Sequence, residues 1–484
     1  MALVVAQASS RSDARRLQRA AGAGELRRLH AGIYTDDLQE DLAVIVRREL
    51  YPLCALLAPD ALISHRSALE PGPTAAGEVF LTGPYRRSIR LPGLTLRVAE
   101  GRGPIASDVR IPTARGNVHR SSDARALLEN MQPSRARDPH RRRTLGAEGV
   151  ERWLERLLAR DGESSLNRVR DQAREIAATL DLHGELIVLD AQIGALLGTR
   201  EHRLSHPQAI ARARGRPYDG ERIELFERLA RYLHAHPPAV PRATADIDNN
   251  LQAFVEAYFS NFIEGTEFEL DEAHEIVVRG RPLQYREDDS HDILGSYRAI
   301  LDSVASARFP DSYAGLLDQL KAWNERVIPS RTDKRPGEIK TLPNRAGTTT
   351  FVSPDLVPGT LERGFEFLAA ARTAEARAAL AMFIVAEIHP FADGNGRTAR
   401  LAMNLALSAD DRTRIVVPTV FRDDYLPALR ALSQQRNPEP YVRMLGRAAS
   451  FSAWLDYRSQ EQCFAQLERS NAMADPREAQ LKFP

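Results

Sequence analysis

The sequence predicts a mainly α-helical protein, with a helical core that follows a mixed α+β region. From Asp246 to about Ser459 the apolar residues recur at helical spacing, apart from one non-helical stretch at 329–358. Residues 78–114 instead hold short strand-like runs separated by Gly and Pro. The 484 residues are long enough for two to four domains.

Composition excludes several protein classes. The 43% hydrophobic and 27% charged residues indicate a folded chain rather than a disordered one. No apolar run reaches 18 residues, so we expect no membrane span and no membrane partner. The N-terminus lacks the pattern of a secretory signal, and Cys54 and Cys463 are too far apart and too few for a disulfide scaffold. These features predict a cytoplasmic protein.

The first element, residues 1–115, reads as a winged-helix-like module that binds DNA. A basic helix from Ala14 to about Ala21 precedes a Gly break, and a turn around Gly32 would form the wing. Residues 1–150 carry 23 Lys+Arg against 16 Asp+Glu, a balance that favours nucleic-acid contact. We take Arg27 and Arg28 as the leading candidate DNA contacts. Use of the module for dimer or interdomain contacts stays open.

Two segments of this region resemble a known family. Leu26-Arg-Arg-Leu-His-Ala-Gly-Ile-Tyr34 and Ile63-Ser-His-Arg-Ser-Ala-Leu69 resemble the N-terminal region of AbiEi-type antitoxins and related winged-helix regulators. The resemblance implies DNA binding with autoregulation.

The remaining boundaries follow from composition. A helical connecting region is expected over 116–245, with an exposed Arg-rich stretch at 134–144 and a stiff His236–Pro241 break at its end. The helical core is predicted over 246–450, and 451–484 forms a C-terminal tail.

The most informative segment is His389-Pro-Phe-Ala-Asp-Gly-Asn-Gly-Arg-Thr-Ala-Arg400. An Ala-rich apolar helix precedes it and another helix follows, so His389 to Gly396 forms a tight loop at a helix N-terminus. Backbone N–H groups and the helix dipole make such a loop an anion site, and glycines allow a phosphate to approach. Arg397 and Arg400 add guanidinium groups suited to phosphate oxygens.

Two further side chains complete this catalytic loop, residues 389–400. Asp393 offers one carboxylate, a typical protein share of Mg²⁺ coordination when phosphates and water supply the rest. His389 has an ordinary pKa near neutrality and suits proton transfer from an attacking hydroxyl.

This segment resembles the signature of the Fic family, His-x-Phe-x-(Asp/Glu)-Gly-Asn-Gly-Arg-x-x-Arg, at every fixed position. The resemblance implies an all-helical Fic core and transfer of AMP from ATP to a hydroxyl of a target protein, with release of pyrophosphate. It implies that His389 is the general base and Asp393 the Mg²⁺ ligand. It also implies that Gly394-Asn395-Gly396 cradle the phosphates. Arg397 would contact the β-phosphate and Arg400 the γ-phosphate, while Phe391 would be an apolar anchor.

Other activities remain to be compared. Family members that phosphorylate their targets typically have Lys in place of the second loop Gly, so Gly396 favours adenylylation. Phosphocholine transfer stays open. The competing hypothesis is a DNA-binding regulator whose Fic domain acts as a sensor or removes AMP. The sequence also leaves a second copy of the chain open as a partner.

A second motif lies upstream. Ile247, Leu251, Phe254, Tyr258 and Phe262 mark one face of a helix expected over about 247–265. Near its end, Ser260 and Glu264 are four apart and Gly265 suits a helix C-cap. The segment resembles the family's inhibitory motif (Ser/Thr)-x-x-x-Glu-(Gly/Asn). The resemblance implies that Glu264 pairs with Arg400 and occupies the γ-phosphate position, although an exposed Glu before a C-cap would look the same.

The stretch 336–354 predicts a β-hairpin in the helical region, with two arms around Asn344-Arg-Ala-Gly347. In the Fic family a hairpin flap here clamps the target peptide by strand addition. We expect the flap, residues 339–351, to contact the target through two arms, which are Ile339-Lys340-Thr341 and Thr349-Thr350-Phe351. A hairpin that only caps the bundle is the alternative.

Overall fold

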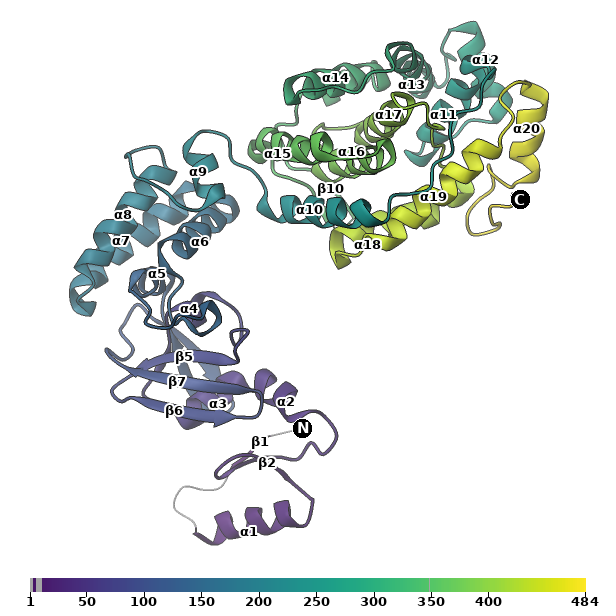
Figure 1. Ribbon diagram of the computed structural model, residues 1–484. Helices are drawn as coiled ribbons and strands as arrows, with labels where there is room; N and C mark the ends of the chain where they lie inside the picture. The colour runs from purple at the N-terminus through teal and green to yellow at the C-terminus, as the bar shows by residue number, and fades with distance from the viewer. Residues whose placement is uncertain (1–2, 6–10, 348) are drawn as a thin grey trace. The chain divides into compact units, whose positions relative to one another are not determined.

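The computed structural model describes residues 3–5, 11–347 and 349–484, and the chain divides into two compact units, residues 1–214 and 215–484 (Figure 1). The first unit mixes strands and helices, and the second is almost entirely helical. This agrees with the mainly α class predicted from the sequence, with a β-containing N-terminal region.

A three-stranded antiparallel sheet opens the first unit. Helix α1 (Arg11–Gly22) covers the predicted basic helix, and strands β1 (Leu3–Val5), β3 (Ile33–Thr35) and β2 (Arg27–His30) pair in that order. The β2–β3 turn holds Gly32 in a left-handed conformation, at the place predicted for the wing. Arg27 and Arg28 therefore lie on a strand.

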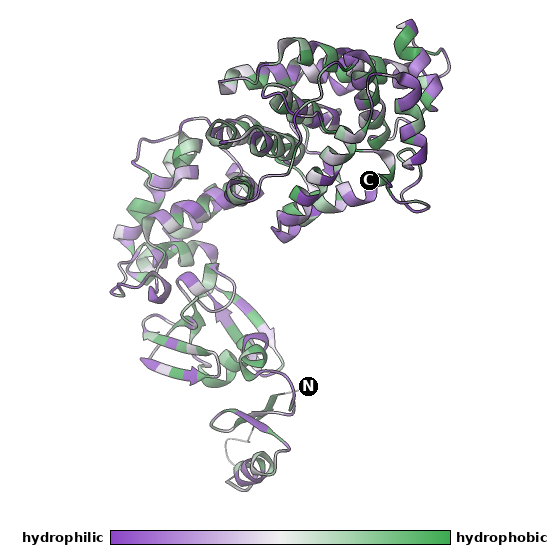
Figure 2. Cartoon of the chain, turned by 45° about the vertical axis from the view of Figure 1, so that its right-hand side comes forward, coloured by the Kyte–Doolittle hydropathy of each residue, from purple (hydrophilic) through white to green (hydrophobic). Residues whose placement is uncertain are grey.

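The rest of the first unit surrounds a mixed six-stranded sheet of order β6-β7-β5-β4-β9-β8. The predicted strands are confirmed as β5 (Glu78–Gly83), β6 (Arg87–Leu91) and β7 (Leu94–Glu100). Along β7 the buried Leu94, Leu96 and Val98 alternate with more exposed residues, as expected for a strand with one face on a core. Figure 2 shows the same mixture of hydrophobic and hydrophilic bands on these strands. The other strands are β4 (Leu62–Ile63), β8 (Val109–Thr113) and β9 (Gly116–Arg120).

Short helices pack on this sheet, and a group of helices follows it in the chain. The short helices are α2 (Leu42–Arg48), α3 (Leu50–Leu57) and α4 (Arg66–Leu69). The group that follows consists of α5 (Asp123–Met131), α6 (Gly146–Asp161), α7 (Glu163–Leu180), α8 (His183–Leu196) and α9 (Pro207–Ala213). A second core lies among α4 to α9, separate from that of the sheet. The predicted connecting region 116–245 is thus divided: its part up to Arg214 packs within the first unit.

The second unit begins with α10 (Gly220–Ala235), which packs against α15 (Val357–Ala370) and α16 (Ala374–Ile388). Helix α16 is buried on nearly every side, because Ala and aliphatic residues occupy most of its positions. It packs most extensively against α17 (Asn395–Ser408). The other helices are α11 (Asn249–Ile263), α12 (Leu270–Arg279), α13 (Glu287–Ser306), α14 (Tyr313–Val327), α18 (Arg422–Gln435), α19 (Glu439–Trp454) and α20 (Gln460–Arg469).

One short hairpin interrupts the helices of the second unit. It consists of β10 (Arg345–Ala346) and β11 (Thr349–Thr350), with residue 348 outside the described residues. In the described part of the chain, no helix is long and apolar enough to cross a membrane.

Candidate active site

The loop between α16 and α17 is the centre of the site. Helix α16 ends at Ile388 because Pro390 cannot continue it, and His389 adopts a left-handed conformation with a φ of 54°. Gly394, also left-handed, forms the N-cap of α17, as predicted for a loop that opens a new helix. A Cβ on Gly394 would lie 2.9 Å from the Asn324 side-chain nitrogen, which itself donates to the Asp393 carbonyl. Gly is therefore required here both by conformation and by space.

The Asn395 side chain holds the loop closed. Its Oδ1 accepts from the Phe391 N–H at 2.9 Å, and its Nδ2 donates to the Phe391 carbonyl at 2.9 Å. Phe391 is only 1% exposed, which agrees with its predicted place as an apolar anchor. Because both ends of the Asn395 amide are used within the loop, only its backbone N–H is left to contact an anion.

The two arginines of the loop are buried on the first turns of α17. Arg397 donates to Asp292 at 2.7 Å and to the Asn261 side chain at 3.1 Å. Arg400 donates from Nε to Ser260 Oγ at 2.9 Å and from Nη2 to the Ser260 carbonyl at 2.8 Å. Helix α11 thus supplies acceptors to both guanidinium groups.

Glu264, the C-cap of α11, completes the Arg400 contacts. Its Oε1 accepts from Arg400 Nη2 at 2.7 Å, and Gly265 follows with a φ of 94°. A Cβ on Gly396 would lie 2.0 Å from the same oxygen, so only glycine leaves space for the carboxylate. Burial pushes the pKa of Glu264 upward, but Arg400 and Arg397 outweigh burial and hold this pKa below its usual value. A carboxylate therefore stands at the opening turn of α17, where an anion is favoured.

His389 is oriented by one hydrogen bond and one ring contact. Its Nδ1 lies 3.1 Å from the Ala386 carbonyl, and because a carbonyl only accepts, Nδ1 carries the proton. Nε2 is then the nitrogen able to receive a proton. The Phe351 ring stacks on the imidazole with centroids 3.7 Å apart and planes at 6°. Burial lowers the pKa of His389 to about 4, so the ring is neutral at physiological pH.

The flap differs from its predicted form in one arm. Thr349 and Thr350 lie on β11 as expected, but their partner strand is Arg345–Ala346 rather than Ile339–Thr341. Ile339 instead forms a bridge with Phe391, and the Lys340 N–H donates to the Pro390 carbonyl at 2.9 Å. The predicted first arm was therefore wrong, because the backbone of the catalytic loop competes for those hydrogen bonds.

Lys340 shows the consequence of that exchange. Its side chain is buried and its Nζ donates to Asn344 Oδ1 at 2.6 Å, while burial lowers its pKa to about 8. Thr341 and Thr350 are exposed, and the Thr350 carbonyl already accepts from Arg222 at 2.7 Å. The two threonines face solvent, whereas Lys340 is buried against the catalytic loop.

One carboxylate is available to a metal ion. Asp393 is half-buried, and its Oδ1 accepts from the Gly394 N–H at 2.6 Å. Across the described ranges, no group of three or more His, Cys, Asp or Glu side chains could hold a metal. A single carboxylate is a donor set that suits Mg²⁺ when phosphates and water supply the other ligands.

Several contributing residues carried no signal in the sequence. Asp292 is fully buried between Arg397 and Arg331, and it comes from α13, about a hundred positions before the loop. Asn261, Asn324 and Tyr425 also reach the loop or its arginines from other helices. Their positions depend on helix packing, so no local motif could identify them. Phe351 was expected to face the target, whereas its ring lies on His389.

Similarities to known proteins agree with this site. Residues 315–407 match the model of the Fic/DOC family. Over 204 residues the chain is 26% identical to the protein adenylyltransferase fic-1 of Caenorhabditis briggsae, and equally to that of Caenorhabditis elegans. The matches cover 41% of this chain and 40% of each relative, so the chain spans about two fifths of their length.

A solved structure of Fic-1 from C. elegans is 19% identical, covers 67% of this chain and 98% of the other, and has a TM-score of 0.37. The catalytic loop lies within the residues that match the family model. Residues 315–407 are therefore similar to the Fic/DOC family, and the curated relatives of the chain are named protein adenylyltransferases.

Proposed function

We propose that this chain is a self-inhibited protein adenylyltransferase, which transfers AMP from ATP to a hydroxyl side chain of a target protein. The observation that carries the proposal is the Glu264 carboxylate, which pairs with Arg400 and stands over Gly396. A site that uses its own carboxylate where an anion is favoured is built to be occupied by a phosphate when that carboxylate leaves.

The chemistry follows from the positions of the side chains. The target hydroxyl oxygen attacks the α-phosphorus, and Nε2 of His389 takes the hydroxyl proton. The bond between the α-phosphorus and the α,β-bridging oxygen breaks, and pyrophosphate leaves. The Ala386 carbonyl holds the imidazole in the tautomer that this step requires, and the Phe351 stack holds the plane of the ring.

The nucleotide phosphates would lie along the start of α17. Backbone N–H groups of Asn395 and Gly396, with Arg397 and Arg400, offer donors to the β- and γ-phosphates. Asp393 would hold Mg²⁺, which neutralises phosphate charge when it is bound. Arg400 is available to a γ-phosphate only after Glu264 has released it.

Labelled ATP tests this function directly. Glu264→Gly protein is incubated with Mg²⁺ and ATP labelled either at the α- or at the γ-phosphate, with Glu264→Gly/His389→Ala as the matched control. We expect label from the α-phosphate alone to become attached to protein, and none in the control. Attachment of the γ-label would instead indicate phosphorylation, and no attachment with lysate proteins as targets would reject the transferase.

We also propose that the first unit binds DNA, as a second and independent function. Arg15 and Arg19 are exposed and four apart on α1, and Arg28 is exposed on β2, so the N-terminal part of the first unit presents several basic side chains to solvent. Arg27 is less suited, because it donates to the Glu40 carbonyl. A duplex shift assay at low and high salt tests this, with Arg15→Glu/Arg19→Glu as the variant. No shift at low salt by the full chain would contradict it.

A further inference from the structure

One guanidinium group joins the flap to the helix that ends at the base. Arg222 lies on the first turn of α10 and is half-buried. Its Nη2 donates to the Thr350 carbonyl at 2.7 Å, and its Nη1 forms an ion pair with Glu387 Oε1 at 3.1 Å. Thr350 immediately precedes Phe351, and Glu387 lies two residues before His389. Both members of the ring stack are therefore linked through Arg222.

The flap needs an outside support, because its strands are too short to hold their own position. β10 and β11 have two residues each, and an isolated two-stranded hairpin is only marginally stable in water. The Phe351 N–H donates to the Asn344 carbonyl, and hydrogen-bonded positions alternate along an antiparallel pair. The carbonyl of Thr350 therefore points away from β10, and Arg222 donates to it there. Helix α10 thus fixes β11 from its outer edge.

The other end of this bridge is fixed as well. Glu387 is 4% exposed, and its second oxygen accepts from Ser433 of α18 at 2.5 Å. A buried carboxylate is costly without a cationic partner, so Glu387 keeps Arg222 in place. The planar fork of arginine can reach a carboxylate and a carbonyl at once, whereas the single ammonium group of lysine cannot reproduce that geometry.

We propose that Arg222 is a positioning residue for AMP transfer, which keeps the Phe351 ring on the His389 imidazole by holding β11 and the end of α16 at a fixed separation. As far as it concerns transfer, this inference rests on the proposed function. Arg222 touches neither ring, and its effect passes through the backbone of Thr350 and the side chain of Glu387.

This role is exerted through contacts rather than through charge. The charged side chains that act most strongly on the imidazole of His389 are Glu264 of α11, Lys340 of the flap and Asp393 of the catalytic loop. Arg222 is not among them. Arg222→Lys keeps the positive charge beside Glu387 and loses only the fork, so this variant separates geometry from electrostatics.

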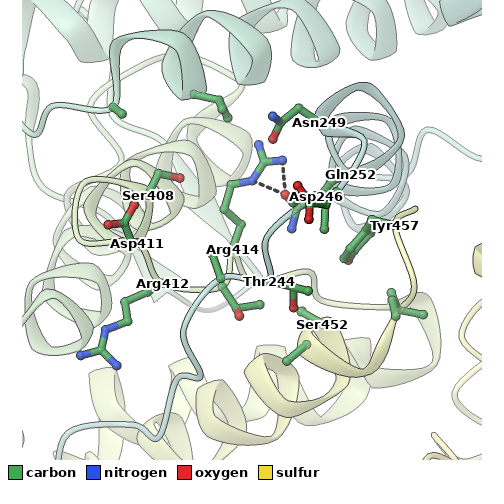
Figure 3. Close-up of a pocket in the computed structure, with 17 residues that line it drawn as sticks. Thr244, Asp246, Asn249, Gln252, Ser408, Asp411, Arg412, Arg414, Ser452 and Tyr457 are labelled. Carbon is green, nitrogen blue, oxygen red and sulfur yellow. Dashed lines mark hydrogen bonds between the residues drawn. The ribbon is translucent and has the colours of Figure 1, made fainter. Parts of the chain in front are cut away.

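Two other arginines of the second unit provide matched controls. Arg231 lies on the same helix as Arg222, and its exposed side chain pairs with Glu227 at 3.0 Å. Arg414 is 5% exposed, and its Nε and Nη2 both donate to Gln252, as Figure 3 shows. Among the described residues, none of the catalytic loop or the flap lines the cavity beside Arg414. Arg414→Lys therefore measures the loss of a buried arginine fork outside the site.

Initial rates in a Glu264→Gly background give the first test. Arg222→Lys should lower kcat for AMP transfer at least ~3-fold, because a small misplacement of a reacting group slows the reaction. KM for ATP should stay nearly unchanged, since the nucleotide contacts come from α17. Arg231→Lys should change neither, and Arg414→Lys should lower the melting temperature without lowering kcat. When Phe351→Ala is also present, Arg222→Lys should have little further effect, because the ring that it positions is already absent.

A spectroscopic measurement tests the same point without any activity. The Phe351 ring lies flat on the imidazole and shifts its proton signals, so NMR of the full-length protein with labelled histidine rings reports the stack. At pH 8 without nucleotide, where the His389 ring is neutral, Arg222→Lys should move these signals toward their positions in Phe351→Ala. The spectrum of His389→Ala assigns them. If Glu264→Gly transfers no AMP, the proposed function fails while the ring signals still decide whether Arg222 holds the stack.

Three results would overturn the positioning role: unchanged kcat and ring signals in Arg222→Lys, an equal loss of kcat in Arg414→Lys, or a full further loss when Arg222→Lys is added to Phe351→Ala. Circular dichroism and thermal melting establish that each variant folds. Arg222→Gln, which keeps donors without the charge, is the second variant if Arg222→Lys does not fold. Failure of both to fold, while Arg414→Lys folds, would leave Arg222 with a structural role alone.

Discussion

The catalytic loop and the flap contact each other, yet they are held in different ways. The loop has a local closure, since the Asn395 side chain bonds both backbone groups of Phe391 four positions away, and hydrogen bonds from Asn324 and Lys340 add to it. The flap is held by distant residues: Arg222 of α10 donates to the Thr350 carbonyl and Gln434 of α18 to the Thr349 hydroxyl. A structure closed by local contacts can be inferred from a short motif, whereas one held by distant contacts cannot.

The largest effect is expected when the general base of the catalytic loop is removed. In a Glu264→Gly background, His389→Ala should lower the rate of AMP transfer at least ~10²-fold, because proton removal from the target hydroxyl is lost. Nucleotide binding should persist, since the phosphate contacts come from α17. Initial rates with labelled ATP, together with a binding titration of ATP, measure both. A residual rate above one tenth of that of the Glu264→Gly protein would mean that AMP transfer does not depend on His389.

The next effect concerns the contact between Glu264, at the end of α11, and Arg400 of the catalytic loop. Glu264→Gly should raise autoadenylylation at least ~10-fold, equivalent to ~1.4 kcal/mol in the population of competent complexes. Arg400→Ala should not activate, because it removes the partner of Glu264 and the phosphate contact together. Glu267→Gly, an exposed acid three residues later, serves as the matched control. An unchanged rate in Glu264→Gly would mean that residues 260–265 are only the ordinary end of a helix.

A smaller effect is expected where the flap touches the loop. Phe351→Ala removes the ring that stacks on His389 and should lower kcat several-fold, since the imidazole is no longer held in place. Phe351→Tyr keeps the ring and should stay near the reference rate. Thr350→Ala, in the exposed part of β11, should change KM for a protein target more than kcat. Equal rates in Phe351→Ala and Phe351→Tyr would show that the stack has no positioning role.

These two regions also show what the sequence could predict. His389, Asp393 and Arg400 were accessible because they fall within one short loop between two helices, whereas the Glu264–Arg400 contact was expected only from the resemblance to the inhibitory motif. The first arm of the flap was not accessible. Ile339 and Lys340 have strand-like character, but whether their N–H groups pair with Thr349 and Thr350 or with Pro390 and Phe391 depends on tertiary packing.

Buried partners and unit boundaries escaped prediction for the same reason. Asp292 lies in a helix with no motif, and only the packing of α13 beside α17 makes it the partner of Arg397. Similarly, α10 packs within the second unit although its sequence gives no indication of which unit it joins. The spacing of apolar residues locates helices well, but it does not specify which helices pack against each other.

The smallest expected effect is a pH dependence that links the loop to the flap. Burial holds the pKa of His389 at about 4, so the free enzyme keeps a neutral base from pH 8 down to about pH 5. In Glu264→Gly protein, kcat/KM should therefore show no acid limb from His389 across that range. Adding Phe351→Ala exposes the imidazole, which should raise its pKa toward the ordinary value near 6.5 and lower kcat/KM at pH 6 relative to pH 8.

The ratio of the two proteins at each pH is the quantity to measure, because titration of ATP itself affects both equally and cancels. The ratio should be flat above pH 7.5 and should fall as the pH decreases through about 6.5, since only the protein without the Phe351 ring then protonates its base. Proton titration of the His389 ring by NMR in both proteins would assign the limb to this residue. A limb near pH 6.5 in the protein that retains Phe351 would show that the flap does not bury the base, and that the stack observed on the loop is not its working state.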